Sequence, residues 1–246
     1  TSYAINYTNK WANFKIEEES SWKKYLKLFP EDSRLKGGAS VSYMNSIKAI
    51  KQVKKYLKNP KAIFILRDPV ERAYSHYWHQ LRQSRTLYSF KTSLERDRNI
   101  FDFSVYPDKI RAWEDSLGEK NIHILLLEEL VDRPQETMDN LFNFLNVSSC
   151  KINLPKKYAG SFPKFPRVYR LFNALLYVLG KKFTSTNLDE NDYWTLPEKA
   201  FRKIILTDNK PDLDNKLRKK LETIFYHENK EILEWKPEAK KYWSIF

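Results

Sequence analysis

The chain of 246 residues is 41% hydrophobic and 15% aromatic, which excludes a disordered protein and suits one α/β domain over residues 1–246. Its 44 Lys and Arg against 31 Asp and Glu give a formal net charge of +13, which favours anionic partners such as nucleotides or acidic glycans. The single cysteine, Cys150, excludes an internal disulfide and a metal site built on thiolates, and we expect it to be a small core thiol.

The N-terminal part of the chain contains two predicted helices and one predicted strand. Ser20–Phe29 has apolar residues at helical spacing and is followed by a proline, and Ser46–Leu57 forms a second, basic helix. Lys61–Leu66 is a short apolar run rich in branched side chains, which predicts a buried strand.

A strand-to-helix junction follows this strand directly. Asp68 can cap a helix, Pro69 suits its first position, and Glu71 stands where a capping box places its carboxylate. The helix is therefore predicted to run from this cap to about Gln83.

The alternation of strand and helix continues downstream. Tyr106–Leu117 predicts a helix and Asn121–Leu127 a second buried strand, and a further helix begins around Pro134. Its expected apolar face consists of Met138, Leu141, Phe142 and Leu145. This order favours a parallel sheet covered by helices, with ligands bound along the edge where strands end and helices begin.

After Cys150 the pattern is mostly helical. The predicted helices are Arg167–Leu179, Leu196–Ile205, Leu213–Phe225 and Asn229–Trp235, with a turn at Lys210-Pro211-Asp212. We expect them to pack over the sheet and to frame a substrate cleft. The longest apolar stretch, Leu171–Leu179, is too short to span a bilayer and no signal peptide is visible, so we expect a soluble protein that is not transmembrane.

The junction carries the side chains that suit an anion. Arg67 stands at the C-terminal end of the strand, where the N-terminus of the next helix also favours negative charge. Ser75 lies one turn beyond Glu71 on the same helix face, so an arginine fork and a hydroxyl could bind one phosphate monoester. The alternative is that Arg67 pairs with a neighbouring carboxylate and that Ser75 faces solvent.

The order of residues in this segment, RDPVERAYSHY, resembles the 3′-phosphate-binding motif of sulfotransferases, especially the heparan sulfate type and its bacterial relatives. The resemblance implies a P-loop-NTPase-like parallel sheet flanked by helices, with 3′-phosphoadenosine 5′-phosphosulfate as co-substrate and no metal. It implies that Arg67 and Ser75 hold the 3′-phosphate, while Arg72 braces the motif.

Other passages support the resemblance between about Ser20 and Trp235. These are Ser104-x-Tyr106 with Trp113, the run LEEL with DRPQETMDNLFNFLNV, and NKPDLDNKLRKKLETIFYHEN. The segment FPKFPRVYRLF occupies the stretch where the family often places further cofactor contacts, which makes Arg167 and Tyr169 additional candidates. The alternative is a basic amphipathic helix that packs through Val168, Leu171 and Phe172.

The second nucleotide site of the family is not found in this sequence. Relatives bind the 5′-phosphosulfate with an N-terminal strand–loop–helix that resembles a P-loop. Gly37-Gly38 is not followed by Lys and Ser or Thr, and is not preceded by a predicted strand. We therefore expect that the strand–loop–helix unit is missing and that the chain begins after it.

The catalytic residues are unknown from the sequence. Transfer needs a base for the acceptor's proton, and relatives supply Glu in two motifs, where this chain has Ala4 and Gly38. His76 and His79 are weaker candidates, since an imidazole has an ordinary pKa of ~6.5 but either ring could equally serve the core or the surface. No spacing typical of a metal site occurs.

The leading hypothesis is a sulfotransferase that moves a sulfonyl group to a hydroxyl or amine on a glycan, lipid or small metabolite. The alternative is a catalytically inactive member that acts as a binding module. No nucleic-acid partner is expected, because only the net charge supports one. The resemblance implies the cytoplasm for a bacterial protein and the Golgi lumen for an animal one.

Overall fold

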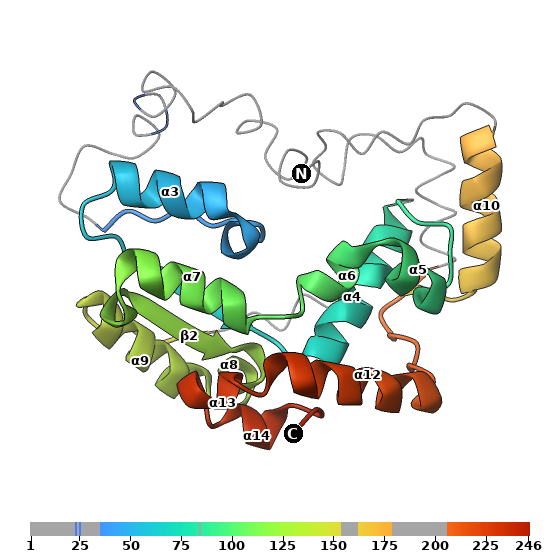
Figure 1. Ribbon diagram of the computed structural model, residues 1–246. Coiled ribbons are helices and arrows are strands. Elements are labelled where there is room, and N and C mark those ends of the chain that lie inside the picture. The colour runs from blue at the N-terminus through green and yellow to red at the C-terminus, as the bar shows by residue number, and fades with distance from the viewer. Residues whose placement is uncertain (1–22, 24, 26–34, 84, 154–161, 179–205) are drawn as a thin grey trace. The chain divides into compact units, whose positions relative to one another are not determined.

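The computed structural model describes residues 23, 25, 35–83, 85–153, 162–178 and 206–246 (Figure 1). The chain divides into two compact units, each described separately below. The first unit combines Thr1–Ala62, Lys109–Ile122 and Ser185–Asp192, and the second combines Ile63–Asp108, His123–Thr184 and Tyr193–Phe246.

The first unit is built around helices α3 (Ile47–Tyr56) and α7 (Pro107–Leu117), with the short 3₁₀ helices η1 (Tyr43–Asn45) and η2 (Glu119–Asn121). Ser46 caps α3 by accepting a hydrogen bond from the amide of Ala49 at 3.1 Å, which confirms the predicted helix. The indole of Trp113, on α7, is buried and donates to the carbonyl of Met44 at 3.3 Å. The helix predicted at Ser20–Phe29 lies mostly outside the described residues.

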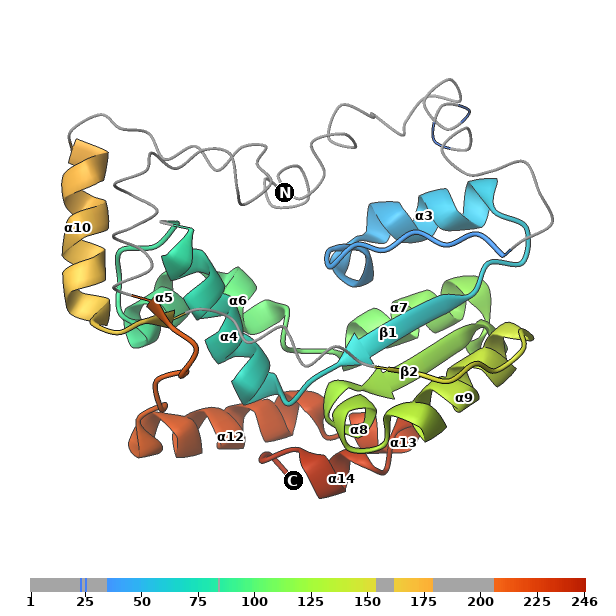
Figure 2. The ribbon, with the colours of Figure 1, turned by 180° about the vertical axis from the view of Figure 1, so that it is seen from behind.

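The sheet of the second unit consists of two parallel strands, β1 (Ala62–Leu66) and β2 (Ile122–Leu126), whose arrows point the same way in Figure 2. Phe64 and Leu66 are buried, but Ile63 and Ile65 are 39% and 59% exposed. The prediction of a buried strand is therefore wrong for one face of β1. Successive side chains of a strand point to opposite faces, and only the face with Phe64 and Leu66 is covered.

Helix α4 (Pro69–Arg82) follows β1 and confirms the predicted junction. Asp68 Oδ1 accepts from the amide of Glu71 at 3.0 Å, and Pro69 is the first helical residue. The capping box is only half formed, because the amide of Asp68 donates to Glu128 Oε1 at 2.9 Å and not to Glu71. The predicted cap at Asp68 is correct, but the carboxylate of Glu71 does not complete the capping box.

Helix α4 is the centre of the second unit and contacts α5 (Phe90–Arg96), α6 (Arg98–Asp102) and α12 (Asn215–Asn229) (Figure 1). The ring of Phe90 lies 4.9 Å from that of Tyr74 and 5.3 Å from that of Tyr77, so aromatic packing joins α5 to α4. The sequence analysis missed α5 and α6, which are short. Ser89 and Asp97 cap these helices, but neither helix shows a clear apolar period.

The remaining elements are mostly helical, as predicted. They are α8 (Leu127–Asp132), α9 (Pro134–Leu145), α10 (Pro166–Val178), α13 (Ile232–Trp235) and α14 (Ala239–Tyr242), with β3 (Phe162–Pro163) antiparallel to β4 (Leu206–Thr207). The helix predicted at Leu196–Ile205 lies outside the described residues. Across the described ranges, no helix combines the length and apolar character that crossing a membrane requires.

Cys150 corrects another prediction, because it is exposed and not part of the core. Helix α9 ends at Asn146, which adopts a left-handed conformation with φ of 57°. The chain then runs through exposed positions from Val147 onward, so the cysteine lies outside the packed helices.

Asn229, at the end of α12, is the buried polar residue on which the helix packing depends most clearly. Its side chain is fully buried, accepts from the amide of Tyr106 at 3.0 Å and donates to the carbonyl of Ser104 at 3.1 Å. Both backbone groups would lose their partner without this amide.

We predict that Asn229→Ala lowers the free energy of unfolding by about 2–3 kcal/mol, because it leaves buried backbone groups unsatisfied. Urea unfolding of the purified chain measures this change. The neighbouring Glu228→Ala, at an exposed position, serves as the control and should change it by less than about 0.5 kcal/mol. An equal effect of the two substitutions would contradict the role given to Asn229.

Candidate functional site

The backbone at the end of β1 is held in place by a buried tyrosine. The hydroxyl of Tyr106 donates to the carbonyl of Arg67 at 2.8 Å, and the tyrosine is only 3% exposed. Burial raises the pKa of Tyr106 well above its ordinary value, so the hydroxyl stays protonated and remains a donor. The position of Arg67 is thereby fixed from the core side.

The next residue, Asp68, joins this junction to the C-terminal segment. Its Oδ2 accepts from the amide of Ser244 at 2.6 Å and from the hydroxyl of Ser244 at 2.9 Å. Glu128, which binds the amide of Asp68, also accepts from the indole of Trp243 at 3.2 Å. The carboxylate of Asp68 therefore caps the N-terminus of α4 and also binds Ser244 near the end of the chain.

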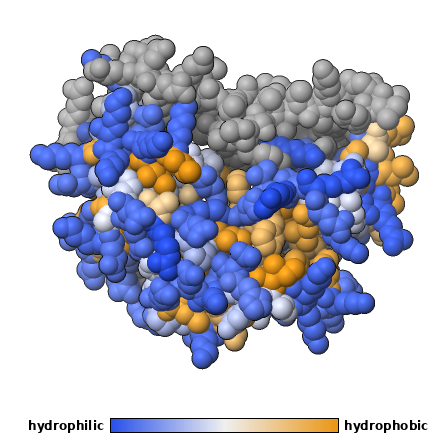
Figure 3. Space-filling view, in the orientation of Figure 1, coloured by the Kyte–Doolittle hydropathy of each residue, from blue (hydrophilic) through white to orange (hydrophobic). Residues whose placement is uncertain are grey.

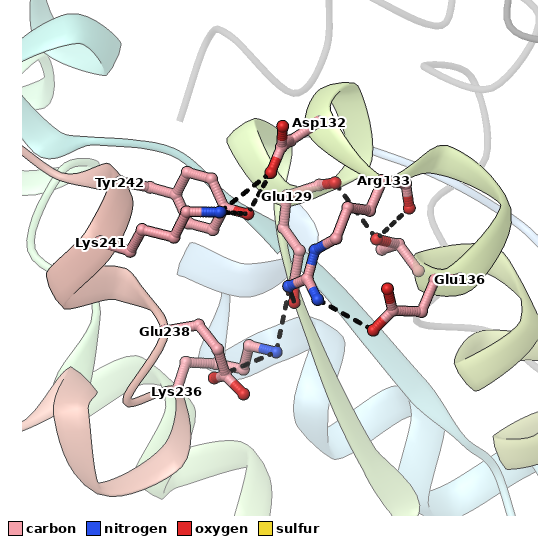
Figure 4. Close-up of polar contacts among 9 residues, drawn as sticks. Glu129, Asp132, Arg133, Glu136, Lys236, Glu238, Lys241 and Tyr242 are labelled. Carbon is pink, nitrogen blue, oxygen red and sulfur yellow. Dashed lines mark hydrogen bonds and ion pairs between the residues drawn. The ribbon is translucent and has the colours of Figure 1, made fainter.

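Ionic contacts hold the C-terminal segment on α8 (Figure 4). The buried carboxylate of Glu129 is paired with Arg133 and with Lys236, each at 3.1 Å. Asp132 accepts from the hydroxyl of Tyr242 at 2.7 Å and from Lys241 at 3.1 Å. These contacts place Trp243 and Ser244 where they reach the junction.

Three residues spaced by four, Arg67, Glu71 and Ser75, lie along one side of the junction and of α4. The side chain of Arg67 is 33% exposed, and its Nη2 lies 3.7 Å from Glu71 Oε2. This ion pair is longer than a hydrogen bond. Ser75 is half-buried, and its hydroxyl has no hydrogen-bonding partner within the described part of the chain.

The sequence analysis missed two basic residues that converge on the same carboxylate. Lys210 and Arg218 donate to Glu71 at 2.5 Å and 2.7 Å. They are separated from Glu71 by 139 and 147 residues, so no local pattern could signal them. We refer to Arg67, Lys210 and Arg218, with Glu71 at their centre, as the basic cluster.

The basic cluster has three cations around one carboxylate. Burial alone would raise the pKa of Glu71, but the hydrogen bonds from Lys210 and Arg218 outweigh it and hold that pKa below its ordinary value. Burial lowers the pKa of Lys210 and exceeds the opposing effect of Glu71. Arg67, with the longest contact to Glu71 at 3.7 Å, is the cation of the cluster most open to an additional anion.

The first turn of α4 has a backbone amide that is already occupied by a side chain of the protein. The amide of Glu71 in the first turn of α4 is already bound by Asp68, whose negative charge also faces the positive end of the helix dipole. The expectation that the helix N-terminus itself faces the ligand is therefore not supported by the geometry.

Arg72 lies on another side of α4 and has the bracing role that the motif implied. Its guanidinium donates to the carbonyl of Ile100 at 3.3 Å and to the hydroxyl of Ser104 at 3.4 Å, and it lies 5.3 Å from the centre of the Phe103 ring. Burial lowers the pKa of Arg72 to about 10. These contacts join α4 to α6.

Arg167 and Tyr169, on α10, lie away from the basic cluster. Tyr169 is 3% exposed and its hydroxyl donates to the carbonyl of Arg82 at 3.0 Å, at the last residue of α4. Helix α4 has 14 residues, so this end is ~20 Å from its first turn. Arg167 is exposed. Arg67 reaches α4 through its ion pair with Glu71, whereas the hydrogen bond of Tyr169 is made at the opposite end of that helix.

The two histidines of α4 are poorly suited to act as a base near neutral pH. Burial, reinforced by neighbouring arginines, lowers the pKa of His76 to about 3 and that of His79 to about 4. The ring of His76 stacks on Phe103 at 5.9 Å. Both imidazoles are therefore neutral parts of the packing.

Gly37 and Gly38 do not form a phosphate loop. They lie in an irregular stretch that leads to η1, not between a strand and a helix. Ala4, the other position where relatives carry a glutamate, lies outside the described residues. The catalytic base stays unassigned.

Comparisons with known proteins agree with this fold. The model of the sulfotransferase family matches residues 7–149. Among solved structures, a sulfotransferase from Alicyclobacillus acidocaldarius is similar with a TM-score of 0.52 and 22% sequence identity, over 61% of this chain and 65% of that one. The chain thus covers less than two thirds of that structure. A search of curated proteins found no match.

The carboxylate of Glu71 generates a prediction on the pH dependence of stability. Its pKa is lower in the folded chain than its ordinary value of 4.5, so its contribution is present above pH 4.5 and is lost as the pH falls through the folded pKa. Glu71→Gln should therefore cost about 1 kcal/mol at neutral pH and progressively less in acid.

Urea unfolding of wild type and variant at pH 7 and at about pH 3 measures this difference. Glu95→Gln, at an exposed position of α5, is the matched control, with an expected effect below about 0.5 kcal/mol at either pH. A Glu71→Gln effect that stays constant or grows towards acid pH would refute the assignment.

Proposed function

The chain belongs to the sulfotransferase family, and from this premise we propose that it transfers a sulfonyl group from 3′-phosphoadenosine 5′-phosphosulfate to a hydroxyl or amine acceptor. The observation that supports the proposal is the partly accessible guanidinium of Arg67 beside Glu71, with Ser75 one turn beyond Glu71 on α4. The acceptor is a glycan, a lipid or a small metabolite.

Arg67 and Ser75 are the residues that we assign to the 3′-phosphate. Glu71 has closer partners in Lys210 and Arg218 than in Arg67, at 2.5 Å and 2.7 Å against 3.7 Å. The guanidinium of Arg67 therefore retains N–H groups for an oxyanion, and a third of its side chain is accessible. The hydroxyl of Ser75, two turns further on the same side, supplies a second donor.

Rigid support of Arg67 suits this role. Tyr106 and Asp68 fix the backbone before the helix begins, so only side-chain freedom is lost when the guanidinium binds a phosphate. In the proposed reaction the acceptor oxygen or nitrogen forms a bond to sulfur as the bond from sulfur to the phosphate oxygen breaks. A fixed 3′-phosphate would hold the donor in line for this displacement.

A catalytically inactive binding module is the second candidate function. The observation that favours it is Gly38, which has no carboxylate where relatives carry a glutamate. Chromatography detects the release of adenosine 3′,5′-bisphosphate in the presence of panels of hydroxyl and amine acceptors. This measurement distinguishes an enzyme from a binding module. Acceptor-dependent release supports the enzyme, whereas nucleotide binding without release across the panels favours the binding module.

The assignment of the 3′-phosphate predicts a specific binding defect. Arg67→Ala should weaken the binding of adenosine 3′,5′-bisphosphate by about 10- to 100-fold, because a charged hydrogen-bonding group is lost. Adenosine 5′-monophosphate lacks the 3′-phosphate, so its affinity should be unaffected. Isothermal titration calorimetry with both nucleotides measures the difference.

Arg98→Ala is the control, since Arg98 is 86% exposed and pairs with Asp102 at 3.7 Å on α6. It should leave both affinities unchanged, whereas Ser75→Ala should weaken only the bisphosphate, by about fivefold. Equal affinity of wild type and Arg67→Ala for the bisphosphate would contradict the assignment.

A further inference from the structure

Helix α10 presents an apolar stripe to solvent. Phe165 at its N-terminus is 65% exposed, and Val168, Leu171 and Leu175 are 59%, 72% and 54% exposed. At 3.6 residues per turn the last three lie within an arc of about 60° on one side of the helix. Figure 3 shows hydrophobic residues at the surface over α10, at the right edge of the molecule. We refer to these four residues as the α10 stripe.

The opposite side of α10 is firmly packed, so the stripe is not the result of a loosely placed helix. Tyr169 and Asn173 are buried and donate to the carbonyls of Arg82 and Leu81 at 3.0 Å and 3.5 Å. Arg170 donates to the hydroxyl of Tyr77 at 3.3 Å. The alternative considered for this segment, a helix that packs through Val168, Leu171 and Phe172, does not hold for Val168 and Leu171, because hydrogen-bonding side chains occupy the buried face.

The charged residues of the segment that carries the stripe have one sign. The segment from Phe162 to Val178 contains Lys164, Arg167 and Arg170 and no acidic residue. Lys164 and Arg167 are exposed, like the stripe itself. Single exposed apolar residues need no explanation, but a continuous stripe bordered by basic residues is typical of helices that lie in the headgroup region of a membrane.

We propose that α10 docks this protein on the surface of an anionic lipid bilayer. Phe165, Val168, Leu171 and Leu175 enter the boundary between headgroups and acyl chains, and Lys164 and Arg167 contact the lipid phosphates. A helix of 13 residues is too short to span the bilayer and lies in its plane. The inference goes beyond the proposed function and does not depend on nucleotide binding.

Charge also favours a membrane over a second copy of the chain as the occupant of the stripe. A parallel two-fold contact between two α10 stripes would bring Lys164 and Arg167 of each copy near those of the other, and an antiparallel contact would offer them no acidic residue of the partner helix. Like charges placed opposite one another oppose association. An anionic bilayer offers an apolar interior and the complementary charge together.

The test is co-sedimentation of the full chain with vesicles of phosphatidylcholine, with and without phosphatidylglycerol. We expect binding to the phosphatidylglycerol vesicles that weakens with added salt. The double variant Val168→Ser, Leu171→Ser should lower the partition coefficient by at least about tenfold, because two apolar side chains no longer enter the membrane. Arg167→Glu should lower it by about tenfold.

Val131→Ser is the matched control, since Val131 is 70% exposed on α8, outside the stripe, and its variant should bind vesicles like wild type. Thermal unfolding verifies that each variant folds. Failure of wild type to bind anionic vesicles would overturn the proposal. It would also be overturned if Arg167→Glu lost binding while the double serine variant bound fully. If the wild-type chain self-associated and the double serine variant did not, the stripe would be a contact between two copies of the chain, and the membrane proposal would be overturned.

Discussion

The hydrogen bond from the Tyr106 hydroxyl to the carbonyl of Arg67 is the interaction on which the candidate site depends. It fixes the backbone of Arg67, which follows β1. The carboxylate of Asp68, the next residue, joins the cap of α4 to Ser244. A long arginine side chain has many conformations, but its backbone here has one. A phosphate bound by Arg67 is thus held by a guanidinium that starts from a rigid base.

Glu71 connects this rigid base to the rest of the unit. Its carboxylate, in the position of a capping box, binds Lys210 and Arg218 from the C-terminal part of the chain. One negative charge thereby holds two cations near a third. This arrangement explains how a chain of net charge +13 can concentrate a part of that charge at one strand end.

The sequence predicted the features that act over three or four residues, and missed those that join distant parts of the chain. The cap at Asp68 and Pro69 at the helix start follow from local spacing. Lys210 was read only as part of a turn, because its partner is 139 residues away. Hydropathy favours Val168 and Leu171 for the buried face of α10, which was the alternative considered for this segment, but Tyr169 and Asn173 are the buried residues and donate hydrogen bonds to α4. The family itself was recognised from RDPVERAYSHY and is confirmed by the match over residues 7–149.

In the proposed site, the guanidinium of Arg67 and the hydroxyl of Ser75 bind one phosphate together. A crystal structure of the protein with adenosine 3′,5′-bisphosphate tests this most directly. We expect the 3′-phosphate oxygens to lie within hydrogen-bonding distance, about 2.7–3.2 Å, of the Arg67 guanidinium and the Ser75 hydroxyl. A nucleotide bound with its 3′-phosphate on other groups, and with Arg67 still paired only to Glu71, would contradict it.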